Sequence, residues 1–418
     1  MNEEQNINQL PEGWKWVKLG DVCDVVTGTT PPKSDLLNYG NDIPFFKPPH
    51  LWDGTISATE EMLSFKGSAK ARVVPPNTVL VTCIGNLGRT GFVKKTAAFN
   101  QQINAIIENE NIGGKYIFYQ AQSPLFKRQL EKLATGTTVS IVNKGNFETI
   151  YIPLPPKPTQ QAIVSKIEEL FSELDKGIEN LRTAQQQLKT YRQSVLKWAF
   201  EGKLTNENVK EGELPKGWKW VELKEMIDKI RCGSGVVPSN EISNYPILRS
   251  SSVRTGKINF GDIKYVQKIE KIKKDDFIIK GDLLFTRLNG SIDYVGNCAK
   301  VPDGFLNNLI YPDRLFRMRL LKPEYADYIM HLFATSTARR IIEKNAKSTA
   351  GHMRISTPDI TGMLIPLCPD KEQSKIVQEI ESRLSVADKM EESITKSLQQ
   401  AEALRQSILK KAFEGKLV

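Results

Sequence analysis

The chain contains the same unit twice, and this repeat limits its fold more than any other feature. The stretch LPEGWKWV at residues 10–17 returns with a single substitution as LPKGWKWV at residues 214–221. Two longer segments, which begin at Gln160 and Gln373 and both end in FEGKL, agree at nearly half of their aligned positions. Each copy therefore consists of an opening phrase, a globular stretch, a long polar and apolar segment and FEGKL. This order predicts a pseudo-twofold molecule.

The two long segments have the apolar pattern of helices. Their apolar residues alternate steps of three and four, as in the seam of a coiled coil. The seam residues are Ile167, Leu170, Leu174, Leu181, Leu188 and Val195 in the first copy and Ile380, Ala387, Ile394, Ala401 and Ile408 in the second, and Tyr191, Trp198, Met390 and Leu404 continue the pattern. Gly202 and Gly415 stand where a helix end favours a left-handed residue. So narrow a stripe needs a partner, and the other copy in the same chain is available.

The globular stretches differ from the helices and from each other. Short β-rich runs bounded by turn residues dominate, for example residues 77–85, 102–109, 276–288 and 313–320, with one or two helical pieces between them. This mixture predicts an α+β class. The expected organisation is a globular domain at 1–156, a long helix at 157–204, a second globular domain at 205–369 and a second long helix at 370–418. Two globular domains that differ in sequence, each followed by a similar long helix, suit a target that has two different parts.

Composition excludes several classes of protein. The 418 residues fit two globular units, and 40% apolar with 25% charged residues is typical of folded proteins. No apolar run reaches the roughly 18 residues that span a bilayer, and the polar start lacks the features of an export signal, so we expect a cytoplasmic protein without membrane contact. The five cysteines are far apart and form no CxxC pair, which argues against disulfides and structural zinc.

The positive charge of the chain indicates a polyanionic partner. Its formal net charge is +10, and most of the excess lies in residues 205–369. A basic protein that is merely soluble is the alternative interpretation.

The sequence carries no recognisable catalytic motif. Adenine methyltransferases need an acceptor before Pro-Pro-aromatic, and the nearest string is KPPH at residues 47–50, whose lysine accepts no hydrogen bond. The phosphate loop GxxxxGK[ST] does not occur, which argues against an ATPase. The three histidines are scattered and belong to no nucleophilic dyad. The two EGK strings, at Glu201 and Glu414, are better explained as helix ends than as nuclease residues.

The repeated phrases together resemble the specificity subunits of type I restriction-modification systems. The resemblance rests on the two LPxGWKWV starts, the junctions IPLPPKPTQQAIV and IPLCPDKEQSKIV, and the ends SVLKWAFEGKL and SILKKAFEGKL. It covers residues 10–417, and the complete order, occurring twice, is far more specific than any single phrase.

This resemblance implies two target recognition domains held apart by an antiparallel pair of long helices that form an intramolecular coiled coil. Each domain would read one half of a split sequence in double-stranded DNA, and the helices would set the spacer. The subunit would have no catalytic activity and no cofactor of its own. It would bind two methyltransferase subunits, with two restriction subunits in the full complex, and S-adenosylmethionine, ATP and magnesium would bind to those partners.

Residues that could read DNA are polar and cationic side chains on loops, because cations contact phosphates while guanidinium and amide groups read base edges. In the first domain the candidates are Thr29, Thr30, Lys33, Asn86, Arg89, Lys94, Lys95, Asn100, Gln101, Thr137 and Lys144. In the second they are Arg231, Arg249, Ser251, Arg254, Arg287, Asn289, His352 and Arg354. For each residue alone, a structural role in a turn or a solvated surface is the competing interpretation. The tryptophans of the opening phrases are expected to pack each domain onto the helices.

Two other functions remain open from the sequence. One is a coiled-coil scaffold that gathers proteins without binding DNA. The other is the specificity module of a related defence complex that modifies DNA without cutting it.

Overall fold

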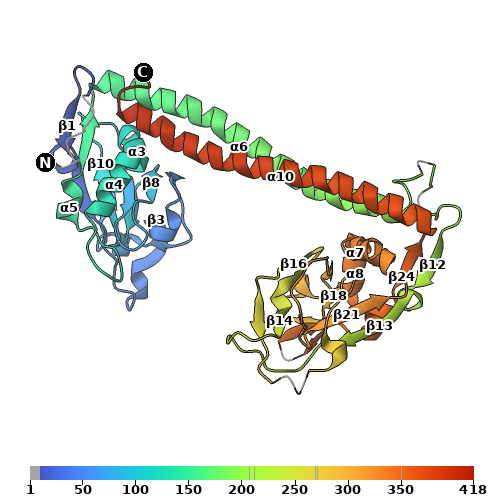
Figure 1. Cartoon of the computed structure of the whole chain (residues 1–418). Coiled ribbons are helices and arrows are strands. Elements are labelled where there is room, and N and C mark those ends of the chain that lie inside the picture. Colours follow the sequence, from blue (N-terminus) through green and yellow to red (C-terminus); the bar gives the residue numbers. More distant parts are fainter. Residues whose placement is uncertain (1–9, 207, 211, 269, 271, 350) are drawn as a thin grey trace. The chain divides into compact units, whose positions relative to one another are not determined.

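The chain divides into two compact units, each of which combines a globular domain with parts of both long helices. The computed structural model describes residues 10–418 except 207, 211, 269, 271 and 350. Unit 1 consists of Met1–Arg182 and Thr395–Val418, and unit 2 of Thr183–Ile394. The long helices α6 (Lys157–Phe200) and α10 (Asp370–Phe413) each contribute one end to each unit (Figure 1). The sequence-based predictions of an α+β class and of two long helices are confirmed.

Unit 1 is built around a five-stranded sheet. Its order is β2 (Asp24–Thr27), β10 (Ile103–Ile107), β7 (Val79–Thr82), β8 (Thr90–Val93) and β4 (Gly54–Ile56). Neighbouring strands are antiparallel except β4 and β8, which are parallel. Every residue of β7 and β8 is buried, as expected of strands that are covered on both faces.

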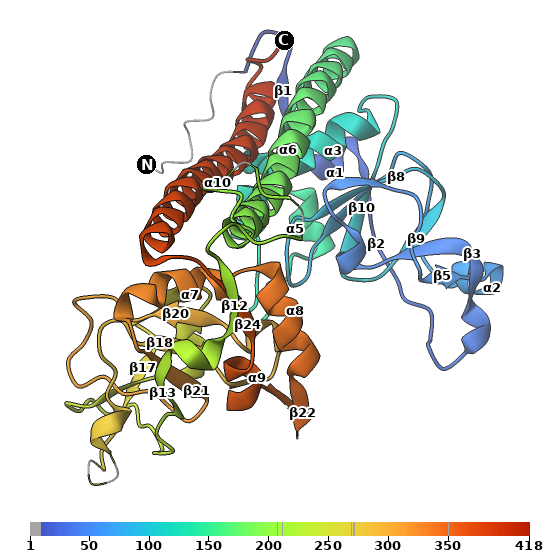
Figure 2. The same ribbon diagram turned by 90° about the vertical axis from the view of Figure 1, so that its right-hand side faces the viewer.

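Two layers cover this sheet. Helices α3 (Gly114–Gln122) and α4 (Pro124–Lys132) pack on the face of Val79 and Val81. A second sheet packs on the face of Leu80, with the order β5 (Met62–Leu63), β3 (Tyr39–Phe46), β9 (Ala97–Phe99) and β6 (Val73–Val74). Figure 2 shows α3 and the layer of β3 and β9 on opposite sides of β8 and β10. The alternation of side chains along β7 thus supplies both cores.

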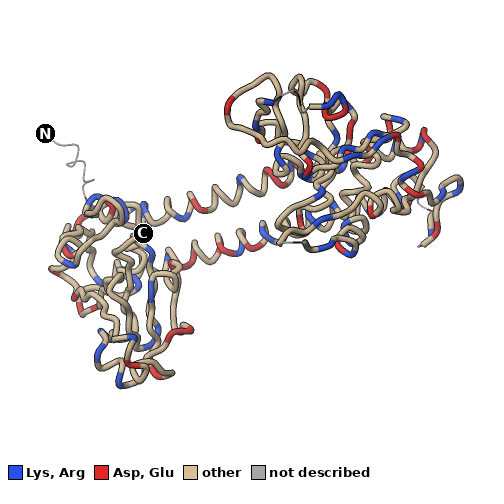
Figure 3. Tube along the Cα trace, turned by 90° about the horizontal axis from the view of Figure 1, so that it is seen from below, with Lys and Arg blue, Asp and Glu red and all other residues tan. Residues whose placement is uncertain are grey.

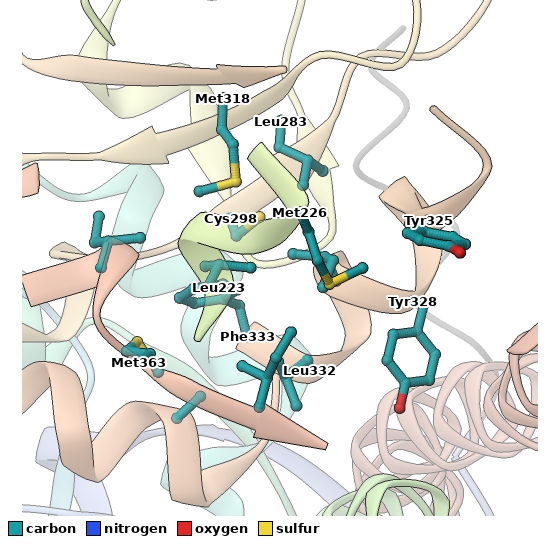
Figure 4. Packing of buried hydrophobic residues seen from close by; sticks show 14 of the residues in the cluster. Leu223, Met226, Leu283, Cys298, Met318, Tyr325, Tyr328, Leu332, Phe333 and Met363 are labelled. Atoms are coloured by element: carbon teal, nitrogen blue, oxygen red, sulfur yellow. The ribbon is translucent and has the colours of Figure 1, made fainter. Parts of the chain in front are cut away.

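Unit 2 repeats this arrangement. Its central sheet has the order β13 (Ile227–Cys232), β21 (Leu315–Leu320), β18 (Leu283–Thr286) and β20 (Cys298–Lys300), which matches β2, β10, β7 and β8. Leu283 and Phe285 of β18 face α7 (Ala326–Phe333) and α8 (Ser336–Asn345), while Leu284 faces the other layer. Figure 4 shows Leu283, Met318 and Phe333 among the buried residues of the helical side. The partial match of VLVT to LLFT in the sequence therefore marks equivalent strands.

Each predicted helical stretch is split into two helices at a capping residue. The Ser123 hydroxyl accepts from the amide of Phe126, and Pro124 follows at the first position of α4. In unit 2, the Thr335 hydroxyl accepts from the amide of Ala338 at the start of α8. Such caps satisfy amides that have no partner within the helix, and proline cannot continue the preceding one.

Some of the smaller elements also correspond between the units. In unit 1 they are α1 (Leu19–Val22), η2 (Leu36–Asn38), η3 (Pro48–His50), α2 (Phe65–Ser68) and α5 (Lys144–Glu148). In unit 2 they are η4 (Leu223–Met226), β14 (Pro246–Leu248), η5 (Ser250–Ser252), β15 (Val253–Arg254), β16 (Lys257–Ile258), β17 (Ile263–Tyr265), η7 (Lys274–Asp276), β19 (Leu288–Asn289), η8 (Ile292–Tyr294), η9 (Pro323–Tyr325), β22 (Lys347–Thr349), β23 (His352–Arg354) and α9 (Thr357–Thr361). β14 pairs with β17 as β3 pairs with β5, and η5 precedes β15 as η3 precedes the turn into β4.

The repeated phrases form a joint in each unit. The opening phrases become β1 (Lys15–Lys18) and β12 (Lys219–Glu222), which pair with β11 (Tyr151–Leu154) and β24 (Leu364–Leu367). Gly202 and Gly415 have φ of 75° and 69°, so the predicted left-handed glycines are confirmed. An added Cβ would lie 2.2 Å from Pro215 Cγ at Gly202 and 2.1 Å from Pro11 Cγ at Gly415. In both units the proline of an opening phrase therefore packs on the glycine of FEGKL.

The tryptophans of the opening phrases have different environments. Trp14 packs on the core of unit 1, and Trp218 is buried in the core of unit 2, where its Nε1 donates to Glu372 Oε2 on α10 at 3.0 Å. Trp220 is 58% exposed on β12, so the expected packing role is wrong for this residue. Side chains alternate between the two faces of a strand, and because Val221 is buried the neighbouring Trp220 lies on the opposite, outer face.

The long helices run antiparallel within each unit. In unit 1, Arg405 forms an ion pair with Asp175, and its guanidinium lies 4.3 Å from the centre of the Phe171 ring. In unit 2, Arg192 forms ion pairs with Asp388 at 2.7 Å and Glu391 at 2.9 Å. Lys and Arg residues are interspersed with Asp and Glu along both helices (Figure 3). Among the described residues, no helix combines the length and the apolarity that a membrane span requires.

The seam residues of these helices are covered. Every residue that we assigned to the seam is buried or half-buried, including Ile167, Val195, Ile380 and Ala387 at 0% exposure. The four further positions that continue the pattern are exposed, namely Tyr191, Trp198, Met390 and Leu404. A straight helix drifts by about 20° per heptad relative to an exact seven-residue repeat, which turns some in-phase positions toward solvent.

Candidate nucleic-acid interface

The loops that carry most candidate residues gather at one edge of each central sheet. In unit 1, β2 and β7 end at the edge where β10, β8 and β4 begin, because Thr27 pairs with Asn104, Thr82 with Ile103 and Gly54 with Gly91. We call residues 28–38, 51–53, 83–89 and 100–102 the loop edge of unit 1. The equivalent residues 233–245, 253–256, 287–297 and 312–314 form the loop edge of unit 2.

A glycine holds the first loop of each edge against the sheet. Gly28 donates to the Ile103 carbonyl at 3.1 Å, and Gly233 donates to the Leu315 carbonyl at 3.2 Å. An added Cβ would lie 2.2 Å from the Asn100 carbonyl oxygen at Gly28 and 2.2 Å from the Tyr311 carbonyl oxygen at Gly233. Only a residue without a side chain permits this approach, so the two loops leave their sheets in the same way.

Seven of the eleven candidates of unit 1 lie at its loop edge, and Thr137 lies beside it. Thr30 donates from Oγ1 to Gln101 Oε1 at 2.5 Å, and Thr29 Oγ1 accepts from the Arg72 amide at 2.8 Å. Asn86 and Arg89 are exposed in the loop from β7 to β8. Thr137 is exposed in the segment that returns to pair Ile141 with Ile84.

Lys33 and Asn100 at this edge, and the three candidates that lie away from it, have different surroundings. Lys94 and Lys95 follow β8 at the opposite end of the sheet, where the Lys94 amide donates to the Ile56 carbonyl. Lys33 is exposed in the first loop, and Lys144 begins α5 and pairs with Glu148 at 3.4 Å. Asn100 is 5% exposed, and its amide group donates to Gln102 Oε1 at 2.9 Å. Asn100 thus shapes the turn between β9 and β10 and is not displayed on the surface.

The structure brings four candidates of unit 2 together. Strand β19, which holds Asn289, pairs with β23, which holds His352 and Arg354. Arg287 precedes β19, and its guanidinium donates to the Asp313 carbonyl at 3.2 Å and lies 5.6 Å from the centre of the Phe316 ring. In this pairing Leu288 lies opposite Arg354 and Asn289 opposite Met353, so the candidates share one small sheet but not one face of it.

Acidic neighbours hold three other candidates of unit 2. Arg231 pairs with Asp275 at 3.0 Å and with Asp276 at 3.2 Å. A hydrogen bond from Lys229, with the nearby charge of Arg231, holds the pKa of Asp275 below its usual value. Arg249 pairs with Asp262 at 3.0 Å, and the Ser251 hydroxyl donates to the same carboxylate. A phosphate would have to compete with these carboxylates for the same donors.

Two exposed residues at the loop edges were missed by the sequence-based predictions. Arg314 lies between β21 and the turn before it, and its carbonyl accepts from the Arg287 amide at 2.9 Å. Trp52 is 66% exposed in the turn before β4. The available signal was the match of FKPPHLWDGTI (46–56) to LRSSSVRTGKI (248–258), which becomes clear only when both are seen to follow equivalent strands.

The assembled edges offer several hydrogen-bond donors, acceptors and cations. Within the described part of the chain, no three His, Cys, Asp or Glu side chains are placed to hold a metal ion. Arginine with neutral amides and hydroxyls, on loops at one edge, is a chemistry suited to phosphate contact and to base-edge hydrogen bonds.

Comparison with known proteins decides the family. The model of the type I restriction modification DNA specificity domain matches residues 11–182. The specificity subunit of the type I restriction enzyme EcoKI from Escherichia coli strain K12 is 30% identical over 98% of this chain and 90% of that protein. The chain belongs to the type I restriction-modification specificity subunits. The specificity subunit of the type I restriction enzyme StySPI from Salmonella potsdam is 26% identical over 99% of this chain and 91% of that protein.

Solved structures share the fold of this specificity subunit. A chain from a structure that addresses complex assembly and conformational transition of a type I system superposes with a TM-score of 0.76 at 21% identity, covering 98% of this chain and all of that one. The crystal structure of the HsdS subunit from Thermoanaerobacter tengcongensis gives a TM-score of 0.58 at 21% identity and covers 99% of both chains. The matched DNA specificity domain and the specificity-subunit relatives give this subunit a role in DNA sequence recognition, and neither the DNA-free scaffold nor the modification-only module is favoured.

Proposed function

We propose that unit 1 and unit 2 each read one half of an asymmetric, bipartite site in double-stranded DNA. The observation that carries this proposal is that the two units build the same loop edge from different residues. Unit 1 has Thr30, Asn86 and Arg89 in the loops of its edge, whereas the loop edge of unit 2 has other residues, among them Arg287 and Arg314. Two loop edges with the same backbone arrangement but different side chains suit two half-sites of different sequence.

A domain exchange tests this division of labour. Residues 214–369 are replaced by the corresponding segment of another specificity subunit, and methylated adenines are mapped in cells that carry the complete system. We expect one half of the methylated motif to change while the other half stays the same. A change in both halves, or in neither, contradicts modular reading.

We further propose that the paired parts of α6 and α10 set the distance between the half-sites. Inserting seven residues after Arg182 and seven after Ile394 keeps the seam in phase and adds about 10 Å of helix. At 3.4 Å per base pair this corresponds to a spacer longer by about three base pairs. The recognised half-sites should not change, and an unaltered spacer would contradict the proposal.

The chain is also proposed to act without chemistry of its own. Two methyltransferase subunits would bind it, with two restriction subunits in the full complex, and S-adenosylmethionine, ATP and magnesium would belong to those partners. The absence of methyltransferase and phosphate-loop motifs from the sequence supports this assignment. The test is to assay the purified chain for adenine methylation and ATP hydrolysis alone and after the partners are added. Either activity in the chain alone would overturn the assignment.

A further inference from the structure

One position in each unit is placed at the loop edge by the same local structure. In unit 1, the Lys47 amide donates to His50 Nδ1 at 3.1 Å across η3. In unit 2, the Arg249 amide donates to Ser252 Oγ at 2.9 Å across η5. The next residues, Leu51 and Val253, are fully buried. The residues that follow are Trp52 and Arg254, which belong to the loop edges; the Trp52 side chain is 66% exposed and that of Arg254 is half-buried.

The indole of Trp52 is exposed, and one part of its ring packs against the backbone of the same turn. An added Cβ on Gly54 would lie 2.1 Å from Trp52 Cζ3, so the ring rests directly against the glycine backbone. The next residue, Asp53, has φ of 62°, and its carboxylate accepts from the amide of Thr90 at 2.8 Å and from the Thr90 hydroxyl at 3.0 Å. These bonds attach the turn to the first residue of β8, directly after Arg89.

The guanidinium of Arg254 is also seated on its neighbours. It lies 4.5 Å from the centre of the Tyr294 ring, and its Nη1 donates to the Val253 carbonyl at 2.9 Å. Thr255 donates to Asn297 Oδ1 at 3.2 Å, which attaches this turn to the loop before β20. No acidic partner of Arg254 is present among the described residues, in contrast to Arg231 and Arg249. Its planar group is thus ordered with donors still available.

The chemistry of this pair favours a nucleic acid over a protein as the common partner. A large exposed aromatic ring alone would suit a protein contact. The equivalent position in unit 2 carries a cation, and both positions stand beside other cationic loops. Apolar contact of an aromatic ring with a thymine methyl and a bidentate contact from arginine to guanine are two established ways to read a base edge in a duplex.

We propose that Trp52 and Arg254 are equivalent base-contacting positions, one in each unit. Trp52 presents an aromatic face and one N–H donor to its half-site, and Arg254 presents a guanidinium that suits the O6 and N7 acceptors of guanine. This inference rests on the proposed reading of one half-site by each unit. It adds which position reads a base and by which chemistry.

The test is selection of bound duplexes from a library in which both half-sites are randomised. The full chain is used in complex with its methyltransferase subunits. For Trp52→Ala and Arg254→Ala we expect roughly a tenfold loss of affinity for the preferred duplex. Each variant should lose base preference at one or two adjacent positions, Trp52→Ala in one half-site and Arg254→Ala in the other.

Further variants separate contact from folding. Gly54→Ala keeps the indole but displaces it, and it should change preference at the same positions as Trp52→Ala. Trp52→Phe should keep part of the preference, and it replaces Trp52→Ala if that variant does not fold. Tyr151→Ala and Lys224→Ala are matched controls, since these exposed residues adjoin the opposite edge of their sheets. Both controls should leave the preferred sequence unchanged.

The outcomes distinguish this inference from the proposed function. If the unaltered complex selects no sequence, the proposed function is wrong. If it selects a bipartite sequence and the Trp52 and Arg254 variants select the same one, the inference alone is wrong. A loss of affinity that is equal for all sequences would also overturn it, because a base contact must discriminate.

Discussion

Several titratable side chains in the two units are buried in their uncharged forms. Burial raises the pKa of the Cys23, Cys83 and Cys368 thiols to about 12. Burial also raises the pKa of Cys298 well above its usual value. His331 on α7 shows the opposite direction, because burial lowers the pKa of an imidazole. These shifts can be tested on the intact chain.

The first residue-scale prediction concerns thiol reactivity. Only thiolates react with iodoacetamide at a useful rate, so the four thiols with raised pKa should stay unmodified in the folded chain at pH 8. Cys232, at the end of β13, is only half-buried and should be the thiol that reacts. Mass spectrometry of the labelled chain should show one modification, and Cys232→Ser should abolish it. Rapid modification of Cys298 would contradict the predicted order.

The second residue-scale prediction concerns pH. The neutral form of His331 is favoured in the folded state, mainly by burial, and the Lys300 charge acts in the same direction while Asp327 opposes it. As the pH falls through about 6.5, the unfolded chain therefore binds a proton at His331 that the folded chain does not bind. The contribution of neutral His331 to the free energy of unfolding is thus present above that pH and lost below it. When the pH is lowered from 7.5 to 5.5, the free energy of unfolding of the wild type, measured in urea, should decrease by up to about 1.4 kcal/mol per pH unit below 6.5 through this residue.

The comparison for this prediction is His331→Leu. Leucine does not titrate, so the stability of the variant should vary less between pH 7.5 and 5.5 than that of the wild type. His50 and His352 are present in both proteins and cancel in the difference. Equal pH profiles would show that His331 does not contribute.

At the scale of elements, the joint between helix end and opening phrase explains why both phrases occur twice. In α6, Lys203 donates to the Trp198 carbonyl at 2.8 Å and Gly202 to the Ala199 carbonyl at 3.2 Å. At the end of α10, the Lys416 amide donates to the Lys411 carbonyl at 2.8 Å, and the Gly415 amide donates to the Ala412 carbonyl at 3.3 Å. These pairs of bonds form the Schellman motif, which requires a left-handed residue. The proline of an opening phrase also packs against each glycine, so the opening phrase and the helix end form one structural unit.

The element-scale prediction uses this joint. Gly202→Ala forces an alanine into the left-handed conformation, which costs about 1–2 kcal/mol of stability. The added methyl group also clashes with Pro215. Gly217 also has positive φ, at 90°, but an added Cβ would meet only Pro369 Cγ at 3.7 Å. Gly217→Ala is therefore the matched control for backbone strain alone. In urea unfolding, Gly202→Ala should be the more destabilising of the two, and equal effects would show that the proline contact is unimportant.

At the scale of the whole molecule, the net charge of +10 should appear in the salt dependence of DNA binding. The logarithm of affinity falls with the logarithm of salt concentration by about 0.9 per phosphate contacted. If Arg89 and Arg314 contact phosphates, Arg89→Ala and Arg314→Ala should each reduce this slope by about one. Lys224→Ala, which removes a cation paired with Glu222, should not change it. Affinity that is independent of salt would contradict DNA binding through these edges.

The pseudo-twofold order, the two long helices and the mixed α+β domains could be predicted from the sequence alone. Heptad spacing, glycines at helix ends and repeated phrases are patterns among residues that are near in the chain, and helices form from such local information. The family also followed from these phrases, because their complete order occurs twice.

Only the tertiary structure decided which candidates share a surface. Strand order depends on pairings between distant segments, and these pairings place Asn86, Arg89 and Gln101 at one edge and Lys94 at the other. The same packing buries Asn100 and gives Arg231 and Arg249 their acidic partners. It also brings Trp52 and Arg254 to equivalent positions. Loop residues obtain their neighbours from the fold as a whole, so their local sequence does not reveal which of them can meet one ligand.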